Sequence, residues 1–372
     1  MSRRAGAALL LLLLAGGLAG WWFWSPPQPH LTLTRASFSD LVGWRDDRVS
    51  AAILPFLRTC LALSGKADTA ATDARPNGLD FGYVGEWRPL CHRAAGLPPH
   101  DDAAARQFFE TATIPLLAAN NGAPEGLFTG YFEITLNGAR QRSGVFQTPL
   151  YRRPPEPGRF NRGEIEDGAL AGQGLELLWV DSPVDAFFLE IQGSGLVRLP
   201  KGQIVRVGYD GANGKTYVPV GRLLLDRREI PREQLTMQAI HVWMEAHPKE
   251  GAALRRENPS YVFFRELKGE GPLGAEQVPL TPERSLAVDR RFLPLGVPLW
   301  LDARQRFGND EIRRLVIAQD TGGAIRGPVR GDLFWGNGDH AAAGAGAMNA
   351  RGHYYLLLPH SVAERLLGNA AH

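Results

Sequence analysis

Two stretches in the first part of the chain repeat apolar residues at helical spacing. The first runs from Ser39 to about Ser64, with Asp40 near its start, where a carboxylate suits the positive end of the helix dipole. The second runs from about Asp101 to Ala119 and ends near Asn120-Asn121-Gly122, a typical helix stop. Residues 66–88 between them are polar and rich in turn formers. The pattern therefore predicts two helices joined by a loop.

From Gly126 onward the pattern changes to short strands. Residues 127–136 alternate and are rich in Phe, Tyr, Thr and Ile, and Asn137-Gly138 directly after them predicts a hairpin turn. An amphipathic helix is predicted over residues 231–246. Further strands are predicted over residues 175–180, 186–191, 204–207, 217–223, 261–264, 284–288, 297–301, 314–319 and 354–358. Short strands with Pro and Gly between them favour a small barrel over βαβ units, so the chain is predicted to be mainly β with N-terminal helices.

The first residues form an uninterrupted apolar segment. Arg3 and Arg4 precede a run from Ala5 to Trp24 that contains no charged residue, and a helix of about 20 such residues spans a bilayer. The basic residues in front of it place the rest of the chain outside the cytoplasm. A secretory signal cleaved near Gly17-Leu18-Ala19 is the alternative. Both interpretations predict that residues 25–372 are exported.

Composition excludes several classes of function. The 372 residues include 43 glycines and 27 prolines, with 44% hydrophobic and 22% charged residues, which argues against wholesale disorder. The net charge of +2 provides no broad positive field, so a dedicated nucleic-acid binder is disfavoured. Cys60 and Cys91 are too few for a zinc ribbon or an iron–sulfur site, but outside the cytoplasm they are compatible with one disulfide. No histidine pair has metal-ligand spacing, so neither a metal nor a cofactor is predicted.

The densest group of candidate chemical residues lies near the C-terminus. Asp320, Asp332 and Asp339 stand among many glycines, which permit positive φ and the close approach of a ligand. The predicted strand Leu315-Val316-Ile317-Ala318 delivers Asp320 at its end, and Asp332 precedes Leu333-Phe334-Trp335. Apolar neighbours of this kind raise the pKa of a carboxyl by desolvation. Aspartates beside glycines also cap turns, which is the competing structural interpretation.

The stretch from Ala318 to Asp339, together with Tyr355-Leu356-Leu357-Leu358-Pro359, resembles the three-aspartate domain of the membrane-bound lytic murein transglycosylase A family. Phe128-Thr129-Gly130-Tyr131-Phe132-Glu133 is similar to the Thr-Gly-Tyr-Tyr segment of that family and is followed by Thr148-Pro149-Leu150-Tyr151. Residues 187–195, 237–240 and 258–264 resemble further blocks. Together these blocks cover roughly residues 125–360 in the order of the family.

The resemblance implies a double-psi β-barrel domain, a second β domain inserted into it and a long groove between the two. The expected parts are a membrane anchor or signal (1–24), a helical part packing on the barrel domain (25–125), the inserted β domain (126–255) and the barrel with the three-aspartate motif (256–372). Many members of the family are lipoproteins attached through a cysteine after the signal. The first cysteine here is Cys60, so the apolar segment itself is the expected anchor if it is retained.

The resemblance also implies an activity and a location. The expected reaction is cleavage of the β-1,4 bond between N-acetylmuramic acid and N-acetylglucosamine in peptidoglycan, with formation of 1,6-anhydromuramic ends. The expected location is the periplasm. The expected partners are peptidoglycan glycan strands and, through the N-terminal segment, the membrane; no nucleic acid is expected, and any wall-synthesis partner is unidentified.

Such a reaction requires one carboxyl group that acts first as acid and then as base, whereas ordinary glycoside hydrolysis uses two. Asp332 is the predicted acid/base, because the catalytic aspartate of the family maps to it and its apolar neighbours favour a raised pKa. Asp320 and Asp339 are predicted to support it, by orienting Asp332, holding the glycine-rich loops or stabilising positive charge on the sugar.

Sugar rings bind to aromatic faces, and acetamido groups bind to amides and hydroxyls. The predicted substrate-binding residues are Thr129, Gly130, Tyr131, Gln192, Gly193, Ser194, Tyr209, Asn213, Tyr217 and Trp335. Phe187, Phe188 and Phe263 are predicted to belong to the core instead.

Two other classes of function stay open. A non-catalytic peptidoglycan-binding module would use the same groove without turnover. An aspartic-type peptidase is suggested by Asp320-Thr321-Gly322, but it needs a second such carboxylate, and no second Asp-Thr-Gly occurs in the chain. Release of soluble anhydro-muropeptides from cell-wall sacculi distinguishes the enzyme from the binding module. A peptidase would instead produce new peptide ends and would be inhibited by a statine-type transition-state mimic.

Overall fold

The structure is a computed structural model that describes residues 28–72, 79–305 and 311–369. The chain divides into two units, Met1–His30 and Leu31–His372, and the fold below is that of the second unit. The apolar segment from Ala5 to Trp24 lies outside the described residues, so its role as anchor or signal stays a prediction. Within the described ranges, no helix has both the length and the apolar character needed to cross a membrane.

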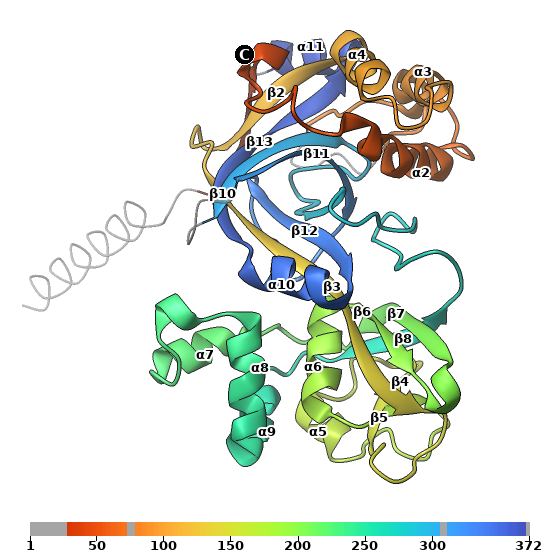
Figure 1. Ribbon diagram of the computed structural model, residues 1–372, viewed down its shortest axis with the longest axis vertical. Coiled ribbons are helices and arrows are strands. Elements are labelled where there is room, and N and C mark those ends of the chain that lie inside the picture. The colour runs from red at the N-terminus through yellow and green to blue at the C-terminus, as the bar shows by residue number, and fades with distance from the viewer. Residues whose placement is uncertain (1–27, 73–78, 306–310, 370–372) are drawn as a thin grey trace, which may run out of the picture. The chain divides into compact units, whose positions relative to one another are not determined.

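The main sheet of this unit closes on itself (Figure 1). Its pairs run β13–β10, β10–β11, β11–β9, β9–β12, β12–β3 and β3–β13, which returns to the starting strand. These ring strands are β3 (Gly126–Ala139), β9 (Ser285–Val288), β10 (Pro298–Gln305), β11 (Glu311–Asp320), β12 (Arg330–Asn337) and β13 (Asn349–Pro359). The β11–β9 and β12–β3 pairs are parallel and the other pairs of the ring are antiparallel. β2 (Thr113–Asn120) pairs with β13, and β1 (Leu31–Arg35) pairs with β2.

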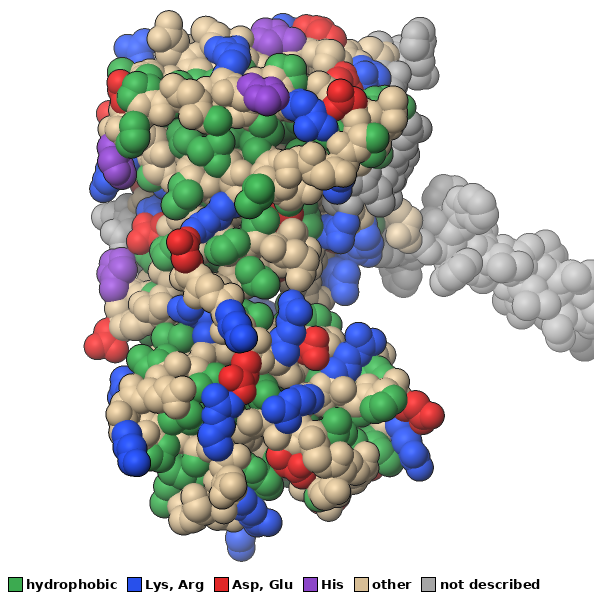
Figure 2. Space-filling view, turned by 90° about the vertical axis from the view of Figure 1, so that its right-hand side faces the viewer, with side chains coloured by type: hydrophobic (Ala, Val, Ile, Leu, Met, Phe, Trp, Pro, Cys, Tyr) green, Lys and Arg blue, Asp and Glu red, His purple; other side chains and the backbone are tan. Residues whose placement is uncertain are grey.

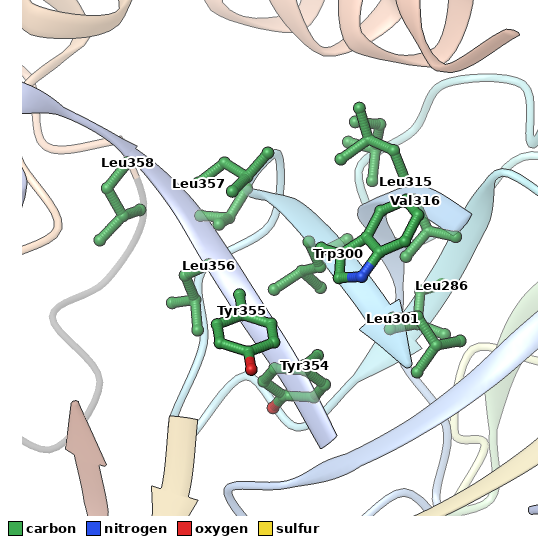
Figure 3. Packing of buried hydrophobic residues seen from close by; sticks show 14 of the residues in the cluster. Leu286, Trp300, Leu301, Leu315, Val316, Tyr354, Tyr355, Leu356, Leu357 and Leu358 are labelled. Atoms are coloured by element: carbon green, nitrogen blue, oxygen red, sulfur yellow. The ribbon is translucent and has the colours of Figure 1, made fainter. Parts of the chain in front are cut away.

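Apolar side chains of the ring strands form the largest core (Figure 3). Trp300, Leu301, Leu315 and Leu356 are completely buried there, and each side chain of this kind contributes about 1.5–3 kcal/mol on burial. Because β9 is buried at every position and β11 through most of its second half, these strands have nearly continuous apolar sequences. The predicted strands at 284–288, 297–301, 314–319 and 354–358 are therefore confirmed as β9, β10, β11 and β13.

Helices before the ring strands cover part of this sheet, and one more follows the last strand. They are α2 (Ile53–Leu63), α3 (Val84–Ala95), α4 (Asp102–Ala112) and, at the C-terminus, α11 (His360–Asn369). The predicted helix over 39–64 is α-helical only in its last part, because its earlier part forms the 3-10 turns η1 (Phe38–Asp40) and η2 (Val49–Ala52). A disulfide between Cys60 and Cys91 joins α2 to α3, so the two cysteines do pair.

The prediction of one helix from Asp101 to Ala119 is wrong in its second half. The helix α4 begins as expected, with the Asp101 carboxylate capping the amide of Ala104, but it ends at Ala112, and the chain continues as β2. Pro115 has no amide hydrogen and disfavours helical backbone at Ile114 before it. The apolar residues that suggested a helical face instead lie in a strand that is buried at nearly every position.

Residues 134–267 are named the distal region below. They begin in the second half of β3 and separate its first half from β9 in the sequence. The distal strands are β4 (Thr148–Tyr151), β5 (Glu176–Val180), β6 (Ser194–Arg198), β7 (Ile204–Ala212) and β8 (Val262–Leu267). The distal helices are α5 (Arg162–Glu166), α6 (Pro183–Gln192), α7 (Val220–Asp226), α8 (Met237–Ala246) and α9 (Pro248–Glu257), with 3-10 turns η4 (Pro200–Gly202) and η5 (Arg232–Gln234). β3 belongs to both regions, because its first half pairs with β12 and β13 and its second half pairs with β6 and β5 (Figure 1).

Several predictions for the distal region are wrong. The run 186–191 is not a strand but lies within α6, which is capped by the Ser182 hydroxyl, begins with Pro183 and ends at Gly193 with φ 79°. These three residues are the usual start and stop signals of a helix. The apolar residues that suggested a strand are buried on all sides of this helix. The run 217–223 enters α7 rather than a strand.

The predicted turn at Asn137-Gly138 is also wrong, because β3 continues through both residues. A Cβ at Gly138 would lie 2.5 Å from the Val197 side chain and 2.8 Å from the Trp179 carbonyl oxygen. The glycine therefore serves close packing and not a turn. The predicted strands at 175–180, 204–207 and 261–264 are confirmed by β5, β7 and β8, and the predicted helix over 231–246 begins later, at Met237.

Candidate active site

A cavity of about 570 Å³ lies between the ring and the distal region. Its ring wall consists of Tyr131, Asp320–Ile325 and Asp332. Its distal wall consists of Glu190–Ser194, Tyr209, Ala212, Tyr217, Ser260, Val262, Arg265 and Leu267. Residues between Leu273 and Leu280 complete the lining. The cavity contains three carboxylates, Glu190, Asp320 and Asp332, whose surroundings differ.

Asp332 lies on β12, opposite Thr129 of β3 in the parallel register and Ala287 of β9 in the antiparallel register. The Thr129 hydroxyl donates a hydrogen bond of 2.5 Å to Asp332 Oδ1. Burial raises the pKa of Asp332 to about 6, although the charge of Arg330 and the bond from Thr129 oppose the rise. Among the described residues, no hydrogen bond reaches the other oxygen, Oδ2. This carboxyl can therefore hold a proton near neutral pH and has one oxygen free for a ligand.

Asp320 lies at the end of β11, directly after a shift in register against β9. Such an irregularity redirects side chains; the neighbouring Gln319 is fully buried, whereas Asp320 lines the cavity. Three donors bind its carboxylate: the Tyr131 hydroxyl at 2.7 Å, the Ala275 amide at 2.9 Å and the Thr321 amide at 2.8 Å. Burial raises the pKa of Asp320, and these three hydrogen bonds oppose the rise. Asp320 is thus a fixed acceptor and not a free carrier of a proton.

Tyr131 donates a hydrogen bond to Asp320, and the charges of Asp320 and Asp332 both act on its hydroxyl. Burial and the nearby carboxylates, chiefly that of Asp320, raise its pKa well above the usual range, so its hydroxyl stays protonated and donates to Asp320. Its ring lies 5.3 Å from that of Phe334, in the apolar cluster beneath the cavity.

Helix α2 supports the loop that donates to Asp320. The Arg58 guanidinium donates to the Pro279 carbonyl oxygen (3.1 Å) and the Thr281 hydroxyl (2.9 Å), and the Thr59 hydroxyl donates to Glu276 (2.7 Å). Because the disulfide at Cys60 fixes this helix to α3, the loop that carries the amide of Ala275 has an anchored support.

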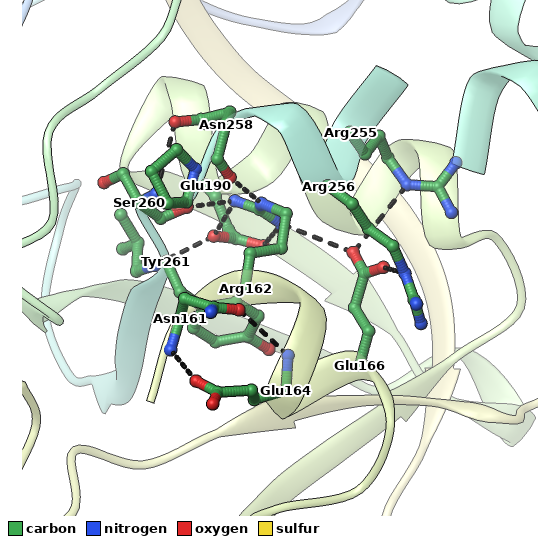
Figure 4. Close-up of polar contacts among 12 residues, drawn as sticks. Asn161, Arg162, Glu164, Glu166, Glu190, Arg255, Arg256, Asn258, Ser260 and Tyr261 are labelled. Carbon is green, nitrogen blue, oxygen red and sulfur yellow. Dashed lines mark hydrogen bonds and ion pairs between the residues drawn. The ribbon is translucent and has the colours of Figure 1, made fainter. Parts of the chain in front are cut away.

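Glu190 in the distal wall is fully engaged (Figure 4). The Arg162 guanidinium donates to both of its oxygens, at 3.0 and 2.8 Å, and the amide of Val262 donates to Oε2 at 2.8 Å. The guanidinium carbon lies 4.7 Å from the Phe187 ring centre and 5.3 Å from that of Tyr261. Burial raises the pKa of Glu190, and Arg162 opposes that rise. Both carboxylate oxygens are thus used within the distal region.

Eight of the residues singled out in the sequence line the cavity: Tyr131, Gln192, Gly193, Ser194, Tyr209, Tyr217, Asp320 and Asp332. Gln192 lies there with its amide already in use, because its Oε1 accepts from the amide of Phe132 (3.0 Å) and its Nε2 lies 2.9 Å from the sulfur of Met237. Tyr209 is 55% exposed and offers an accessible aromatic face at the rim.

Four predicted substrate contacts do not line the cavity. Thr129 bonds to Asp332 instead of facing a ligand. Gly130 packs closely beneath α10 (Gly338–Ala347): a Cβ there would lie 2.5 Å from Trp335. Trp335 directs its indole nitrogen to the Met348 sulfur (3.4 Å). The side chain of Asn213 is buried and bonds to backbone atoms, among them the Pro259 carbonyl oxygen and the Tyr261 amide. These residues build the site and its surroundings.

Asp339 is exposed in the first turn of α10 and is not part of the cavity lining. Among the described residues it has neither a hydrogen bond nor an ion pair. Gly336 and Gly338, with φ 96° and 83°, turn the chain at the end of β12 and separate Asp339 from Asp332. The supporting role predicted for Asp339 is therefore not one of direct contact.

Arg330 and Glu190 were missed by the sequence reasoning. Arg330 precedes Asp332 by two positions on one strand, and the two-residue repeat of a strand places both on the same face; this signal was available. Glu190 was hidden by the incorrect strand over 186–191. Among the described residues, no group of three or more His, Cys, Asp or Glu side chains could hold a metal ion.

Two family models match the chain. The MltA specific insert domain matches residues 127–265, and the 3D domain matches residues 284–358. The membrane-bound lytic murein transglycosylase A of Escherichia coli K12 is 38% identical over 239 residues. That match covers 62% of this chain and 65% of the relative, just under two thirds of its length.

Solved structures resemble the chain over a greater length. A membrane-bound lytic murein transglycosylase from Agrobacterium tumefaciens has a TM-score of 0.79 at 34% identity, covering 90% of this chain and 99% of that one. The structure of E. coli MltA with bound chitohexaose has a TM-score of 0.67 at 28% identity, covering 90% and 93%. The fold of these structures thus extends over nearly the whole described chain.

Proposed function

This chain belongs to the membrane-bound lytic murein transglycosylase A family, and on that premise we propose that it cleaves peptidoglycan as a lytic transglycosylase. The bond broken is the β-1,4 link between N-acetylmuramic acid and N-acetylglucosamine, and the product carries a 1,6-anhydromuramic end. The substrate occupies the cavity between the ring wall and the distal wall, as a glycan strand. The chitohexaose bound to E. coli MltA, a chain of linked amino sugars, supports a substrate of this class.

The free oxygen of Asp332 carries the proposal. Of the three carboxylates in the cavity, Glu190 is bound by Arg162 and Val262, and Asp320 is bound by three donors. Asp332 has a hydrogen bond to Oδ1 only, and its pKa of about 6 allows both protonation states near neutral pH. One proton-carrying carboxyl suits a reaction in which the substrate supplies its own nucleophile, whereas hydrolysis needs two.

The reaction proceeds in two proton transfers at the same carboxyl. Protonated Asp332 first donates to the glycosidic oxygen, which leaves with the bonding electron pair as positive charge develops at C1 of the muramic acid. The resulting carboxylate then accepts the proton of the 6-hydroxyl while that oxygen attacks C1 and closes the anhydro ring. Asp332 ends protonated, as it began. Because the attack is intramolecular, it gains the rate advantage of a positioned nucleophile.

Asp320 assists through its charge. Its carboxylate is held in place by the Tyr131 hydroxyl and two amides on the same wall as Asp332. A fixed negative charge of this kind stabilises positive charge that develops on the sugar ring. Tyr131 keeps that carboxylate oriented.

The remaining expectations from the resemblance are part of the same proposal. The ring is a double-psi β-barrel, and the distal region is the inserted β domain. The expected bounds of that domain, residues 126–255, need correction at both ends, because the first half of β3 pairs with β12 and β13 of the ring whereas β8 pairs with β7 of the distal region. The protein works in the periplasm, where residues 1–24 either anchor it or are removed as a signal; the E. coli relative is named membrane-bound.

Mass spectrometry of products from purified sacculi tests the proposal. The full chain is expected to release soluble muropeptides that are one water lighter than the products of hydrolysis, because the anhydro ring forms without added water. Hydrolysed reducing ends would contradict the mechanism. Binding to sacculi without release would favour the non-catalytic module, and new peptide ends would favour a peptidase.

A further inference from the structure

Arg330 is a partly buried cation behind the candidate acid. It lies on β12, two positions before Asp332, and its Nη2 donates a hydrogen bond of 2.8 Å to the hydroxyl oxygen of Thr129. Its Nη1 donates to the Leu127 carbonyl oxygen at 3.3 Å and also to the carbonyl oxygen of Gly331. The guanidinium is therefore fixed by both strands that form the β12–β3 pair.

The Thr129 hydroxyl links this cation to the carboxyl. A hydroxyl has one hydrogen to donate, and its oxygen already accepts the bond from Arg330, whose guanidinium has no acceptor. The hydrogen of Thr129 is consequently directed to Asp332 Oδ1, 2.5 Å away. Because Oδ1 accepts this hydrogen bond, protonation of Asp332 at Oδ1 is less favourable than protonation at Oδ2.

We propose that Arg330 and Thr129 form a positioning pair that confines the transferable proton of Asp332 to Oδ2, the oxygen left free for the substrate. The inference rests on the proposed function, because it describes how the same carboxyl presents its proton. Without the pair, either oxygen of Asp332 could carry the proton, and only one orientation would be productive. Thr129 is thereby assigned to the carboxyl and not to the sugar.

The charges facing Asp332 determine the direction of a pH effect. Arg330 on β12 lowers the pKa of Asp332, as does the bond from Thr129 on β3, whereas Asp320 on β11 raises it. Tyr131 on β3 stays protonated and carries no charge. Burial and Asp320 raise the pKa of Asp332, and Arg330 lowers it. Loss of the Arg330 charge is therefore expected to raise the pKa of Asp332.

The test compares Arg330→Gln with Arg330→Lys in the full chain. Activity that requires protonated Asp332 falls at high pH, and Arg330→Gln is expected to shift that fall to higher pH by about one unit, the scale for loss of a nearby opposite charge. It is also expected to lower kcat about tenfold or more, with KM nearly unchanged, because the proton is less well placed. Arg330→Lys keeps the charge and is expected to restore the wild-type position of the fall.

A second pair of variants keeps the test decisive if Arg330→Gln does not fold. Thr129→Val removes the hydroxyl at nearly constant shape and is expected to shift the fall in the same direction, whereas Thr129→Ser retains the hydroxyl and the wild-type profile. Arg351→Gln, which removes an exposed arginine from β13, is the matched control and is expected to change neither quantity. Reduced activity with an unmoved pH profile in both Arg330→Gln and Thr129→Val would overturn the inference.

Titration of the Asp332 carboxyl separates this inference from the proposed function. Selective carbon-13 labelling of aspartate carboxyl groups, with Asp332→Asn to assign the signal, reports the pKa whether or not the protein is active. A higher pKa in Arg330→Gln and Thr129→Val supports the pair even if no muropeptide is released. An unchanged pKa in both contradicts it even if the wild-type protein is a lytic transglycosylase.

Discussion

The two walls of the cavity contain similar residue types but differ in how their polar atoms are used. On the distal wall, Glu190 and Gln192 bond to the chain's own groups through every oxygen they carry. On the ring wall, Asp320 is equally engaged, but Asp332 keeps one oxygen free. A carboxylate in a cavity is thus not evidence of chemistry by itself. The distal wall shapes the site, and the ring wall holds the group that can transfer a proton.

The surface carries charged side chains of both signs (Figure 2). Lys and Arg side chains gather over parts of the face in Figure 2, with Asp and Glu side chains among them. The net charge of +2 agrees with that mixture. Specific positions, and not a broad field, therefore determine what the cavity can do.

Substitution of Asp332 is expected to have the largest effect on the rate of muropeptide release. Asp332→Asn cannot transfer a proton and is expected to lower the rate of muropeptide release by about 10³-fold, within the range for loss of general acid–base catalysis. Binding to sacculi is expected to persist, because the side chain keeps its shape. Product release and sedimentation with sacculi measure the two quantities. Asp226→Asn, at a carboxylate of α7 that does not line the cavity, is the control and is expected to retain wild-type release; a comparable loss in both variants would contradict the comparison.

Asp320→Asn is expected to have the next largest effect. It removes the fixed negative charge while leaving an oxygen to accept from the amides, so kcat is expected to fall about 10²-fold, as when one preorganised electrostatic group is lost. KM should change little, because the effect lies in the transition state. Steady-state kinetics on soluble glycan strands check this. A rise in KM with unchanged kcat would assign Asp320 to substrate binding instead.

The pH dependence of the wild-type protein tests the ring wall without mutation. In the proposed mechanism the first step needs protonated Asp332, and burial raises the pKa of that carboxyl to about 6. The value of kcat/KM is therefore expected to decline by about tenfold per unit as pH rises above this pKa. A pH-rate profile between pH 4 and 9 measures it. A rate that rises through this range would require the ionised carboxylate in the first step.

The smallest expected effect on rate comes from the distal wall. Glu190→Gln removes the nearer carboxylate partner of the buried Arg162 and leaves the longer pair with Glu166 at 3.7 Å, which is expected to lower the free energy of unfolding by about 3 kcal/mol. The folded fraction should keep the pH profile of the wild type. Glu257→Gln breaks an exposed pair with Arg227 in the same region and should lower the free energy of unfolding much less, because solvent screens exposed pairs. Denaturant unfolding compares them, and equal stability of the two variants would show that the distal wall does not depend on this buried pair.

The ring strands and their aspartates were predictable because their signals are local. The buried strands have continuous apolar sequences, and Asp320 follows one of them directly. The contacts that define the site are not local: the partners Thr129 and Asp332 are 203 positions apart, and Tyr131 and Asp320 are 189 apart. Register across the β12–β3 pair brings the first two together, and no local pattern specifies that register.

The distal region was harder to predict for a different reason. Its helix α6 is buried on all sides, so its apolar residues suggested a strand. Only Ser182-Pro183 at the start and Gly193 at the end indicate a helix there. Burial decides which of the aromatic and amide residues predicted as sugar contacts can reach a ligand. Trp335 and Asn213 cannot, because their side chains contact other groups of the chain. Residue type alone could not separate these from Tyr209 at the rim.

In the proposed mechanism one carboxyl suffices, because the 6-hydroxyl of the sugar is the nucleophile. Digestion of sacculi in water labelled with oxygen-18, followed by mass spectrometry of the released ends, tests it most directly. Attack by the 6-hydroxyl is expected to give anhydro ends that carry no label. Reducing ends that carry labelled oxygen would show attack by water, which would require a second working carboxylate in the cavity.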